Sequence, residues 1–369
     1  MIFLINASGL KTGGGLQVAQ SLCNQLYRFK YHHFIVVLSS YFNTSSLSFE
    51  DNVKVVNYTI GKSFLNVIFG RDVFLDNLVK EENVDAVLTV FGPSRWKPKV
   101  PHLCGFARAQ LILTNSPYNK NIGILERLKF FVWTWMFKKS SKVFYTENKY
   151  ISEMLPHLLN NIKVYTVTNF YNQIFDEPIK WRRTHKLPHF QGITCLSVST
   201  HYSHKNFEII PQIINLMNKS HPDFKIRFVL TFNENEMHIP KDMRDLFVFL
   251  GKVDVSECPY LYEQADIMFM PTLLECFTAT YPEAMRMGIP IVTTDLDFAR
   301  YLCGDAACYY SAVDSAAATE AIYKVATDKD FARQLVMNGK KQLNNYDDYN
   351  TRADKLIAIL EEIAAQHND

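Results

Sequence analysis

The chain of 369 residues is longer than one ordinary domain and predicts two domains of roughly 150 to 200 residues each. Its composition, 48% hydrophobic and 21% charged, is typical of a globular enzyme and excludes a disordered or fibrous chain. The seven scattered cysteines show no CxxC spacing, which argues against a disulfide framework or a zinc site. No apolar run approaches the roughly 18 residues that span a bilayer. Met1–Asn6 leads straight into a strand pattern, so we expect no secretion signal and a cytoplasmic location.

The formal net charge of +2 is divided unevenly along the chain. Residues 1–170 carry a net charge of +9, and residues 171–369 carry a net charge of −7. A basic N-terminal half favours an anionic surface, and we expect that surface to be the inner face of a cytoplasmic membrane. The alternative is an ordinary difference in charge between two domains. Nucleic acid would also suit this charge, but no recognition motif supports it.

The N-terminal half alternates apolar strand patterns with helical patterns, which predicts a doubly wound α/β domain. Its first strand, Ile2–Asn6, is followed by Gly13, Gly14 and Gly15 and then by a helical pattern. Such a loop can bring backbone N–H groups to an anion, although a simple turn would have the same composition. Further strands are predicted at 34–38, 53–57, 86–90, 100–105, 142–146 and 164–168, with helices at 64–82, 121–139 and 147–155.

Residues 124–139 (ILERLKFFVWTWMFKK) are the most membrane-like stretch of the chain. Aromatic and aliphatic residues dominate it, and Arg127, Lys129, Lys138 and Lys139 flank them. This composition favours a partly buried interfacial helix with its basic end near a membrane. Apolar residues cover nearly all faces, however, and a fully buried helix would have the same pattern.

Residues 172–190 break the periodicity with two prolines and mixed charge, which predicts an interdomain linker. The alternation of strands and helices restarts at Ile193 and predicts a second doubly wound domain. We therefore expect domains at 1–172 and 173–345, followed by a C-terminal helical segment at 346–369. In the second half, strands are predicted at 193–199, 225–232, 246–251, 266–270 and 289–294. Helices are predicted at 204–219, 256–264 and 281–287, with two more within 315–344 and a last one at 349–365.

Pro271–Pro290 (PTLLECFTATYPEAMRMGIP) contains two glutamates, Glu275 and Glu283, eight positions apart around the predicted start of a helix. Carboxylates bond hydroxyl groups and helix N-termini hold phosphates, so the stretch suits a sugar attached to a nucleoside diphosphate. Thr280–Glu283 also matches a capping box, which gives Glu283 a structural alternative. Glu275 has no cationic neighbour in its loop, so it is either a surface residue or a ligand-binding one.

Lys205 follows the strand near Thr194–Val198 and opens a predicted helix with Ser203 as its N-cap. A lysine in the first helical turn opposes the helix dipole, and a phosphate between the two would explain its presence there. A solvated surface lysine is the alternative.

Asp295 and Asp297 form a DxD triplet after a strand. Such a pair can hold a divalent metal, but a role in capping the next helix is favoured, and we expect no metal site. Glu275 and Glu283 could also be the carboxylate pair of a glycoside hydrolase, but Lys205 would then be unexplained.

Residues 193–310 resemble the nucleotide-sugar domain of retaining glycosyltransferases of family 4, which have the GT-B fold, of the bacterial surface-polysaccharide type. The motifs that carry the resemblance are Lys205-Asn206, Phe249–Val253, Leu261-Tyr262, Ala265-Asp266, Glu275 to Glu283, Ala284–Pro290 and Gly304–Ala307. The first half matches more loosely, through Gly13–Gly15, Tyr145–Glu147 and Thr168-Asn169.

The resemblance implies two Rossmann-like domains that face a central cleft, with residues 346–369 returning to the N-terminal domain. It implies a metal-independent hexosyltransferase that moves a sugar from a UDP- or GDP-linked donor to a hydroxyl of a glycan or lipid-linked oligosaccharide. The pathway would be lipopolysaccharide or capsule biosynthesis. A nucleotide-sugar 2-epimerase and a catalytically silent nucleotide-sugar-binding partner are the alternatives.

The resemblance also assigns roles to residues, with Lys205 and Glu275 as the catalytic pair. Lys205 would hold the donor diphosphate, Glu275 would bond hydroxyls of the transferred sugar, and Glu283 would bond the ribose. Backbone N–H groups of Phe277, Thr278, Ala279 and Thr280 would meet the sugar and phosphate, and Gly251, Lys252 and Val253 would line the base. Asn206, Thr200 and His201 complete the expected donor site, and Gly13–Gly15 would face the diphosphate and the acceptor.

The chain departs from the family pattern at three positions. Thr200 stands where the family has an arginine, and His201, His204 or Arg108 could replace that charge. Thr278 stands where a glycine is expected. The family's first-domain histidine would fall near Phe106, whereas His102 lies within the predicted strand.

Overall fold

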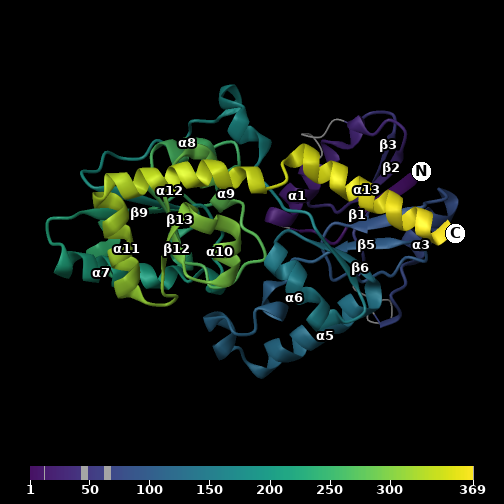
Figure 1. Cartoon of the computed structure of the whole chain (residues 1–369), viewed down its shortest axis with the longest axis horizontal. Coiled ribbons are helices and arrows are strands. Elements are labelled where there is room, and N and C mark those ends of the chain that lie inside the picture. Colours follow the sequence, from purple (N-terminus) through teal and green to yellow (C-terminus); the bar gives the residue numbers. More distant parts are fainter. Residues whose placement is uncertain (12, 43–48, 62–67, 369) are drawn as a thin grey trace. The chain divides into compact units, whose positions relative to one another are not determined.

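The computed structural model of the chain describes all residues except 12, 43–48, 62–67 and 369 (Figure 1). Contacts between residues divide the chain into two compact units. Unit 1 comprises Met1–Thr114, Ile122–Asn169 and Asp347–Asp369, and unit 2 comprises Asn115–Asn121 and Phe170–Tyr346.

Unit 1 is built on a parallel sheet, in which the described strands number seven and follow the order β3-β2-β1-β4-β5-β6-β7. The apolar runs expected in the N-terminal half form these strands, because strands that are covered on both faces need apolar residues throughout. Their bounds are β1 Ile2–Ala7, β2 His33–Leu38, β3 Val53–Asn57, β4 Ala86–Thr89, β5 His102–Gly105, β6 Val143–Thr146 and β7 Lys163–Thr166.

Helices cover both faces of this sheet. Phe3 and Ile5 of β1 point into a core with α1 (Gly14–Cys23) and the last helix α13 (Tyr349–Asn368), whereas Leu4 points into a core with α3 (Val73–Glu81). Helix α13 packs against α1, β4 and β5 (Figure 1). Of the helix expected at 64–82, residues 64–67 lie outside the described residues, and α3 begins after Asp72, whose side chain accepts a hydrogen bond from Leu75 N. The Asp72 cap therefore determines where the helix starts.

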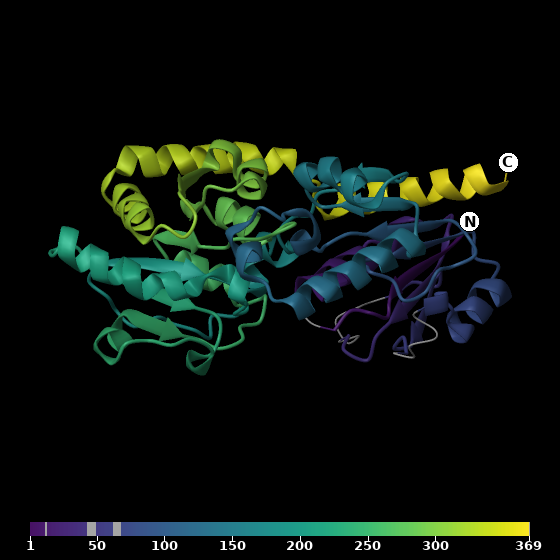
Figure 2. The same cartoon turned by 90° about the horizontal axis from the view of Figure 1, so that it is seen from below.

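Three further helices of unit 1 are α4 (Ala109–Ile112), α5 (Ile124–Ser140) and α6 (Lys149–Leu159). Helix α5 contacts α4 and α6, and it lies on the outside of unit 1 in both views (Figures 1 and 2). Its buried residues lie in its last turns, so the fully buried alternative for this helix is wrong. None of the described helices is long and apolar enough to cross a membrane.

The described strands of unit 2 form a second parallel sheet, in the order β10-β9-β8-β11-β12-β13. Their bounds are β8 Ile193–Ser197, β9 Ile226–Leu230, β10 Phe247–Phe249, β11 Ile267–Met270, β12 Ile291–Thr294 and β13 Ala307–Tyr310. The first five match predicted strands, but β13 was not predicted. The strand order reverses direction between β8 and β11, so the chain leaves these neighbours toward opposite sides of the sheet.

The helices of unit 2 correct one expectation and confirm another. The helix predicted at 204–219 begins only at Ile210, because Asn206 has a left-handed backbone conformation (φ 56°) and Pro211 occupies the first turn. The two helices expected within 315–344 are confirmed, and Asp328 separates them, since it ends α11 and its side chain caps α12. The bounds are α7 Ile210–Ser220, α8 Cys258–Glu263, α9 Thr280–Met287, α10 Asp297–Cys303, α11 Ser315–Thr327 and α12 Lys329–Gln342.

One short segment belongs to a different unit from the one its position in the sequence suggests. Residues 115–121 lie within the expected N-terminal domain, yet their contacts are those of unit 2. Ser116 Oγ donates to the carbonyl oxygen of Leu273 at 2.6 Å, and the Tyr118 ring packs edge-on against His204. The local sequence pattern could not reveal that this segment belongs to unit 2, because the hydrogen-bond partner of Ser116 is 157 positions away.

Candidate active site

The loops that follow β8 and β11 leave neighbouring strands at the point where the strand order of unit 2 reverses. In doubly wound sheets, ligands bind outside the carboxyl ends of the strands at this point. The β8 loop carries Lys205 and the β11 loop carries Glu275, so the topology brings the two expected catalytic residues to one edge of the sheet.

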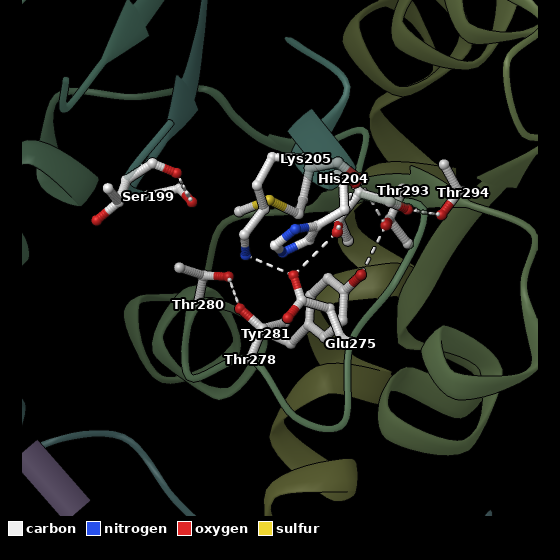
Figure 3. A network of polar contacts seen from close by, with 12 residues as sticks. Ser199, His204, Lys205, Glu275, Thr278, Thr280, Tyr281, Thr293 and Thr294 are labelled. Carbon is white, nitrogen blue, oxygen red and sulfur yellow. Dashed lines mark hydrogen bonds and ion pairs between the residues drawn. The ribbon is translucent and has the colours of Figure 1, made fainter. Parts of the chain in front are cut away.

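Lys205 and Glu275 form a buried ion pair, which Figure 3 shows at the centre of a polar network. Lys205 Nζ donates to Glu275 Oε1 at 2.5 Å, and the Thr272 hydroxyl donates to the same oxygen at 2.9 Å. Each of the two charged residues is 9% exposed. The surface alternatives for Glu275 and Lys205 are therefore wrong, and the cationic neighbour of Glu275 comes from a different loop.

The hydrogen-bonding capacity of this pair is only partly used. The ammonium of Lys205 has three donors, and Glu275 is its single acceptor among the described residues. Both donors to Glu275 reach Oε1, and no described residue donates to Oε2. Two N–H groups of the lysine and one carboxylate oxygen of the glutamate thus remain for a ligand.

The local backbone around Lys205 differs from the expected helix start. Ser203–Lys205 form one 3-10 turn with no side-chain cap, and the left-handed Asn206 separates it from α7. Ser203 is therefore not an N-cap, and Lys205 does not lie in the first turn of an α-helix. Asn206 Nδ2 is buried without a hydrogen-bond partner among the described residues. An unsatisfied buried donor beside the lysine fits an anionic ligand.

His204 connects the two loops. Its carbonyl oxygen accepts from Leu273 N at 2.8 Å and from the Thr272 hydroxyl at 3.4 Å, and its ring stacks on Tyr202. Burial lowers the pKa of His204, although the nearby Glu275 raises it. The imidazole is thus uncharged near neutral pH. The backbone carbonyl of His204, not its ring, positions the β11 loop.

Glu283 lies one turn into α9, and the capping box suggested for it does not form. The N-cap residue of α9 is Ala279, and the Thr280 hydroxyl bonds the Thr278 hydroxyl at 2.9 Å instead of an N–H group (Figure 3). Glu283 Oε2 accepts from the Tyr262 hydroxyl at 2.9 Å. Burial raises the pKa of Glu283 to about 7, and the hydrogen bond from Tyr262 opposes this shift.

Without a capping role, Glu283 is a buried carboxyl group held by one phenol. Its Oε1 has no donor among the described residues, so the group can accept further hydroxyl donors. Tyr262 was not among the expected site residues. It precedes Glu283 by 21 positions, and only its place in the Leu261-Tyr262 motif could have pointed to it.

The first residues of α9 supply backbone donors at the same loop. The N–H groups of the first turn of a helix have no partner within that helix, and together with the helix dipole they attract anions. After Glu275 and Cys276, the chain continues with Phe277, Thr278 and Ala279, and Thr280 opens α9. Tyr281 anchors this turn, because its hydroxyl group bonds the Thr293 hydroxyl group at 2.8 Å (Figure 3).

None of the three candidates for the missing arginine provides a free cation in this unit. Thr200 is exposed, and His201 Nε2 lies 3.0 Å from Glu208 Oε1. His204 is uncharged near neutral pH because burial lowers its pKa. Arg108 belongs to unit 1, where its guanidinium lies over the Trp133 ring.

The loop expected to line the base follows a different strand from the loops of Lys205 and Glu275. Gly251, Lys252 and Val253 follow β10, the edge strand two positions from β8. Gly251 has a φ of 69°, and a Cβ there would lie 3.1 Å from Asn233 Oδ1. The loop conformation therefore requires a glycine at this position.

Gly13, Gly14 and Gly15 belong to unit 1, at the turn from β1 to α1, where the strand order of the first sheet also reverses. Gly13 has a φ of 73°, which favours glycine. His102 is the first residue of β5, and its ring nitrogens bond Thr89 and the carbonyl oxygen of Ser140. Burial lowers the pKa of His102 to about 4, so its imidazole is held uncharged by these two hydrogen bonds within the sheet.

The described residues contain no group of three or more His, Cys, Asp or Glu side chains that could hold a metal ion. Of the DxD triplet, Asp295 forms an ion pair with Arg300 at 2.6 Å, and Asp297 is the first residue of α10 rather than its cap. The proposed capping role of these two residues is therefore wrong.

Solved structures that are similar over nearly the whole chain identify its fold. The chain is similar to a sucrose-phosphate synthase from Thermosynechococcus elongatus, with a TM-score of 0.72, 13% identity and 99% of each chain covered. It is also similar to WaaG, a glycosyltransferase involved in lipopolysaccharide biosynthesis, with a TM-score of 0.66, 14% identity and coverage of 98% of this chain and 99% of that one. The fold is thus GT-B, as expected.

Sequence comparison adds the family for unit 2. Residues 192–328 match the model of the group 1 glycosyl transferases, so this part of the chain is similar to that family. An uncharacterized glycosyltransferase of Haemophilus influenzae is 30% identical over 112 residues, which are 29% of this chain. The match spans 31% of that relative's length. The resemblance to group 1 glycosyltransferases is confirmed.

Proposed function

We propose that the chain is a retaining glycosyltransferase that moves a sugar from a UDP- or GDP-linked donor to a hydroxyl group of an acceptor. The observation that carries the proposal is the buried Lys205–Glu275 pair, which joins the two loops at the reversal of the unit 2 sheet. The similarity of residues 192–328 to the group 1 glycosyl transferases supports the same reaction class.

Each donor group has a matching set of free hydrogen-bonding atoms in unit 2. The two unused N–H groups of Lys205 suit the diphosphate, together with Asn206 Nδ2 and the N-terminus of α9. Glu275 Oε2 suits a hydroxyl of the transferred sugar, and Glu283 suits the ribose hydroxyls. Gly251–Val253 would line the base, and the Gly13–Gly15 loop would meet the diphosphate and the acceptor.

The reaction breaks the bond between the anomeric carbon and the donor phosphate oxygen, and it forms a bond from that carbon to the acceptor oxygen. The acceptor proton passes to the departing phosphate oxygen, so no second carboxylate is required. Lys205 and the α9 N-terminus stabilise the charge that develops on the leaving diphosphate. These groups supply positive charge without a metal ion, and we propose that the transfer is metal-independent.

For the acceptor, we propose a glycan or lipid-linked oligosaccharide of a bacterial surface polysaccharide. WaaG, whose fold this chain shares, acts in lipopolysaccharide biosynthesis, which supports a lipid-linked acceptor. We also propose a cytoplasmic location, peripheral on the inner face of the membrane. The net charge of +9 on residues 1–170 supports attraction to anionic lipid.

Nucleotide release from UDP-, GDP- and CMP-sugars, measured with and without EDTA, tests this function. We expect release from a UDP- or GDP-sugar, with transfer of the sugar to acceptor and no effect of EDTA. Loss of activity in EDTA would contradict metal independence and would return attention to Asp295 and Asp297. Conversion of the sugar without transfer would indicate a 2-epimerase, and binding without turnover would indicate a silent partner.

A further inference from the structure

A cavity in unit 1 lies away from the edge of the sheet where substrates bind. It has a volume of about 430 Å³, within the range of roughly 300 to 1,000 Å³ that small-molecule pockets occupy. His102 and Val143, the first residues of β5 and β6, line it, together with Ile363, Gln366 and His367 of α13. The cavity is thus at the amino-terminal edge of the sheet, whereas ligands of doubly wound sheets bind at the carboxyl edge.

The lining of this cavity is strongly basic. Lys97, Lys138, Lys139 and Lys142 line it, and no carboxylate does; we call it the lysine cavity. None of these four lysines has an ion-pair partner within the described part of the chain. Four uncompensated like charges at one site repel one another, and an anion bound among them would remove that repulsion.

Helix α5 leads into this cavity and carries an uncovered apolar face. The face consists of side chains that recur at helical spacing and are 38% to 82% exposed: Ile124, Leu125, Leu128, Phe131, Val132 and Trp135. In the last turns of the helix, Met136 and Phe137 are buried in unit 1. Figure 2 shows α5 on the outside of unit 1. A contiguous apolar face of this kind marks an interaction surface, because single exposed apolar residues are common but rows of them are not.

One residue connects the apolar face with the lysine cavity. Lys139 lines the cavity, and its Nζ lies 4.9 Å from the centroid of the exposed Trp135 ring. At the other end of the helix, Arg127 and Lys129 flank the face. Aliphatic residues, a tryptophan and flanking lysines are the composition of helices that lie in the interface of an anionic bilayer.

We propose that the apolar face of α5 inserts into an anionic phospholipid membrane and that the lysine cavity binds the phosphate of a lipid headgroup. This inference rests on the proposed attachment to an anionic membrane and names the residues responsible. The apolar face enters the acyl-chain boundary, and the lysines at its end meet the headgroup layer. A soluble protein partner would not require the row of lysines without counterions beside the tryptophan.

Co-sedimentation of the full chain with vesicles tests the proposal without any donor sugar. Vesicles of phosphatidylcholine are compared with vesicles that also contain phosphatidylglycerol. We expect binding to the anionic vesicles alone. Lys138→Gln with Lys142→Gln removes two exposed cavity lysines, and we expect about 25-fold weaker binding, since each basic residue near an anionic surface contributes about fivefold. Leu128→Ser with Phe131→Ser should weaken binding about tenfold or more.

Matched controls remove equal groups elsewhere on unit 1. Lys30→Gln with Lys149→Gln changes the net charge equally, and Tyr31→Ser removes a side chain that is 95% exposed. We expect each control to change vesicle binding by less than about threefold. An equal loss in the lysine control would overturn the cavity as a site, since only the total charge would then matter.

Three other outcomes would also overturn the proposal. Absence of binding to either vesicle would contradict membrane attachment itself. The double variant Lys138→Gln/Lys142→Gln could lose binding of inorganic phosphate and keep vesicle binding unchanged. The cavity would then be a site for a soluble anion. Sedimentation velocity could show that the wild type is a dimer and that the double variant Leu128→Ser/Phe131→Ser is a monomer. The apolar face would then be an interface between two copies of the chain. None of these measurements depends on glycosyl transfer, so that function can fail independently.

Discussion

Lys205 and Glu275 are 70 positions apart in the sequence, yet the lysine Nζ lies 2.5 Å from Glu275 Oε1 in a buried site. The pair joins the β8 loop to the β11 loop, and Thr272 adds a second donor to the same carboxylate oxygen. Each charge satisfies the other while leaving donors and an acceptor free. The pair therefore stabilises the loops before a ligand binds and supplies groups that can bind one.

Removal of one partner should therefore cost stability as well as function. We expect Lys205→Met to lower the free energy of unfolding by about 3 kcal/mol, because Glu275 is left buried without a counter-charge. Lys205→Met with Glu275→Leu should recover most of this loss while remaining inactive. Urea unfolding and nucleotide-release assays measure the two effects. Lys219→Met, which alters an exposed lysine in the last turn of α7, is the control. A double variant no more stable than the single one would refute the structural role.

Glu275→Gln separates the charge of this residue from its hydrogen bonds. The amide oxygen can still accept from Lys205 and Thr272, but Lys205 loses its counter-charge, so we expect a smaller loss of stability than in Lys205→Met and little change in nucleotide affinity. We expect turnover to fall by about a hundredfold, since the carboxylate would contact the sugar where positive charge develops in the transition state. Steady-state kinetics and calorimetric titration with the nucleoside diphosphate measure this. Normal turnover in the variant would remove Glu275 from the catalytic site.

Glu283→Gln should change how stability depends on pH. The pKa of Glu283 is raised to about 7 in the folded chain from an ordinary value of 4.5, so its folded form favours the proton. The stability this provides is full below pH 4.5 and is lost as the pH rises to 7, in total about 3 kcal/mol. Glu283→Gln should lack this loss and be more stable than the wild type at pH 8.

Urea unfolding of both proteins at pH 5 and pH 8 checks this prediction. The difference between the two proteins is the measure, because Glu147, another buried carboxyl with its pKa raised to about 7, contributes equally to both. Parallel pH dependences would show that Glu283 titrates normally. Nucleotide affinity should fall in the variant if Glu283 bonds the ribose.

Gly14→Ala tests the glycine loop of unit 1. Gly14 is the first residue of α1, its φ is not positive, and a Cβ there would meet no atom within 4 Å. Alanine should therefore raise stability by roughly 0.5 to 1 kcal/mol. If a substrate approaches this backbone, turnover should fall in spite of the greater stability. Thermal unfolding and transfer assays measure both, and unchanged turnover would make the loop a simple turn.

Local patterns in the sequence were sufficient for the architecture. Continuous apolar runs predicted most strands because parallel strands covered on both faces leave no solvent-facing positions. The strand β13 was missed, since Ala307–Tyr310 is short and contains small residues. The motif around Glu275 and Glu283 predicted the class of site because these loops are continuous in the chain.

The sequence by itself thus determined two α/β domains, their order, and the loops that carry the candidate site. Only the tertiary structure decided how those residues are used. Glu283 bonds Tyr262 rather than capping its own helix, and Glu275 bonds Lys205, because partners distant in the sequence meet where parallel strands end side by side. The apolar pattern of α5 was likewise ambiguous, since burial depends on which neighbours cover a helix and not on its own residues.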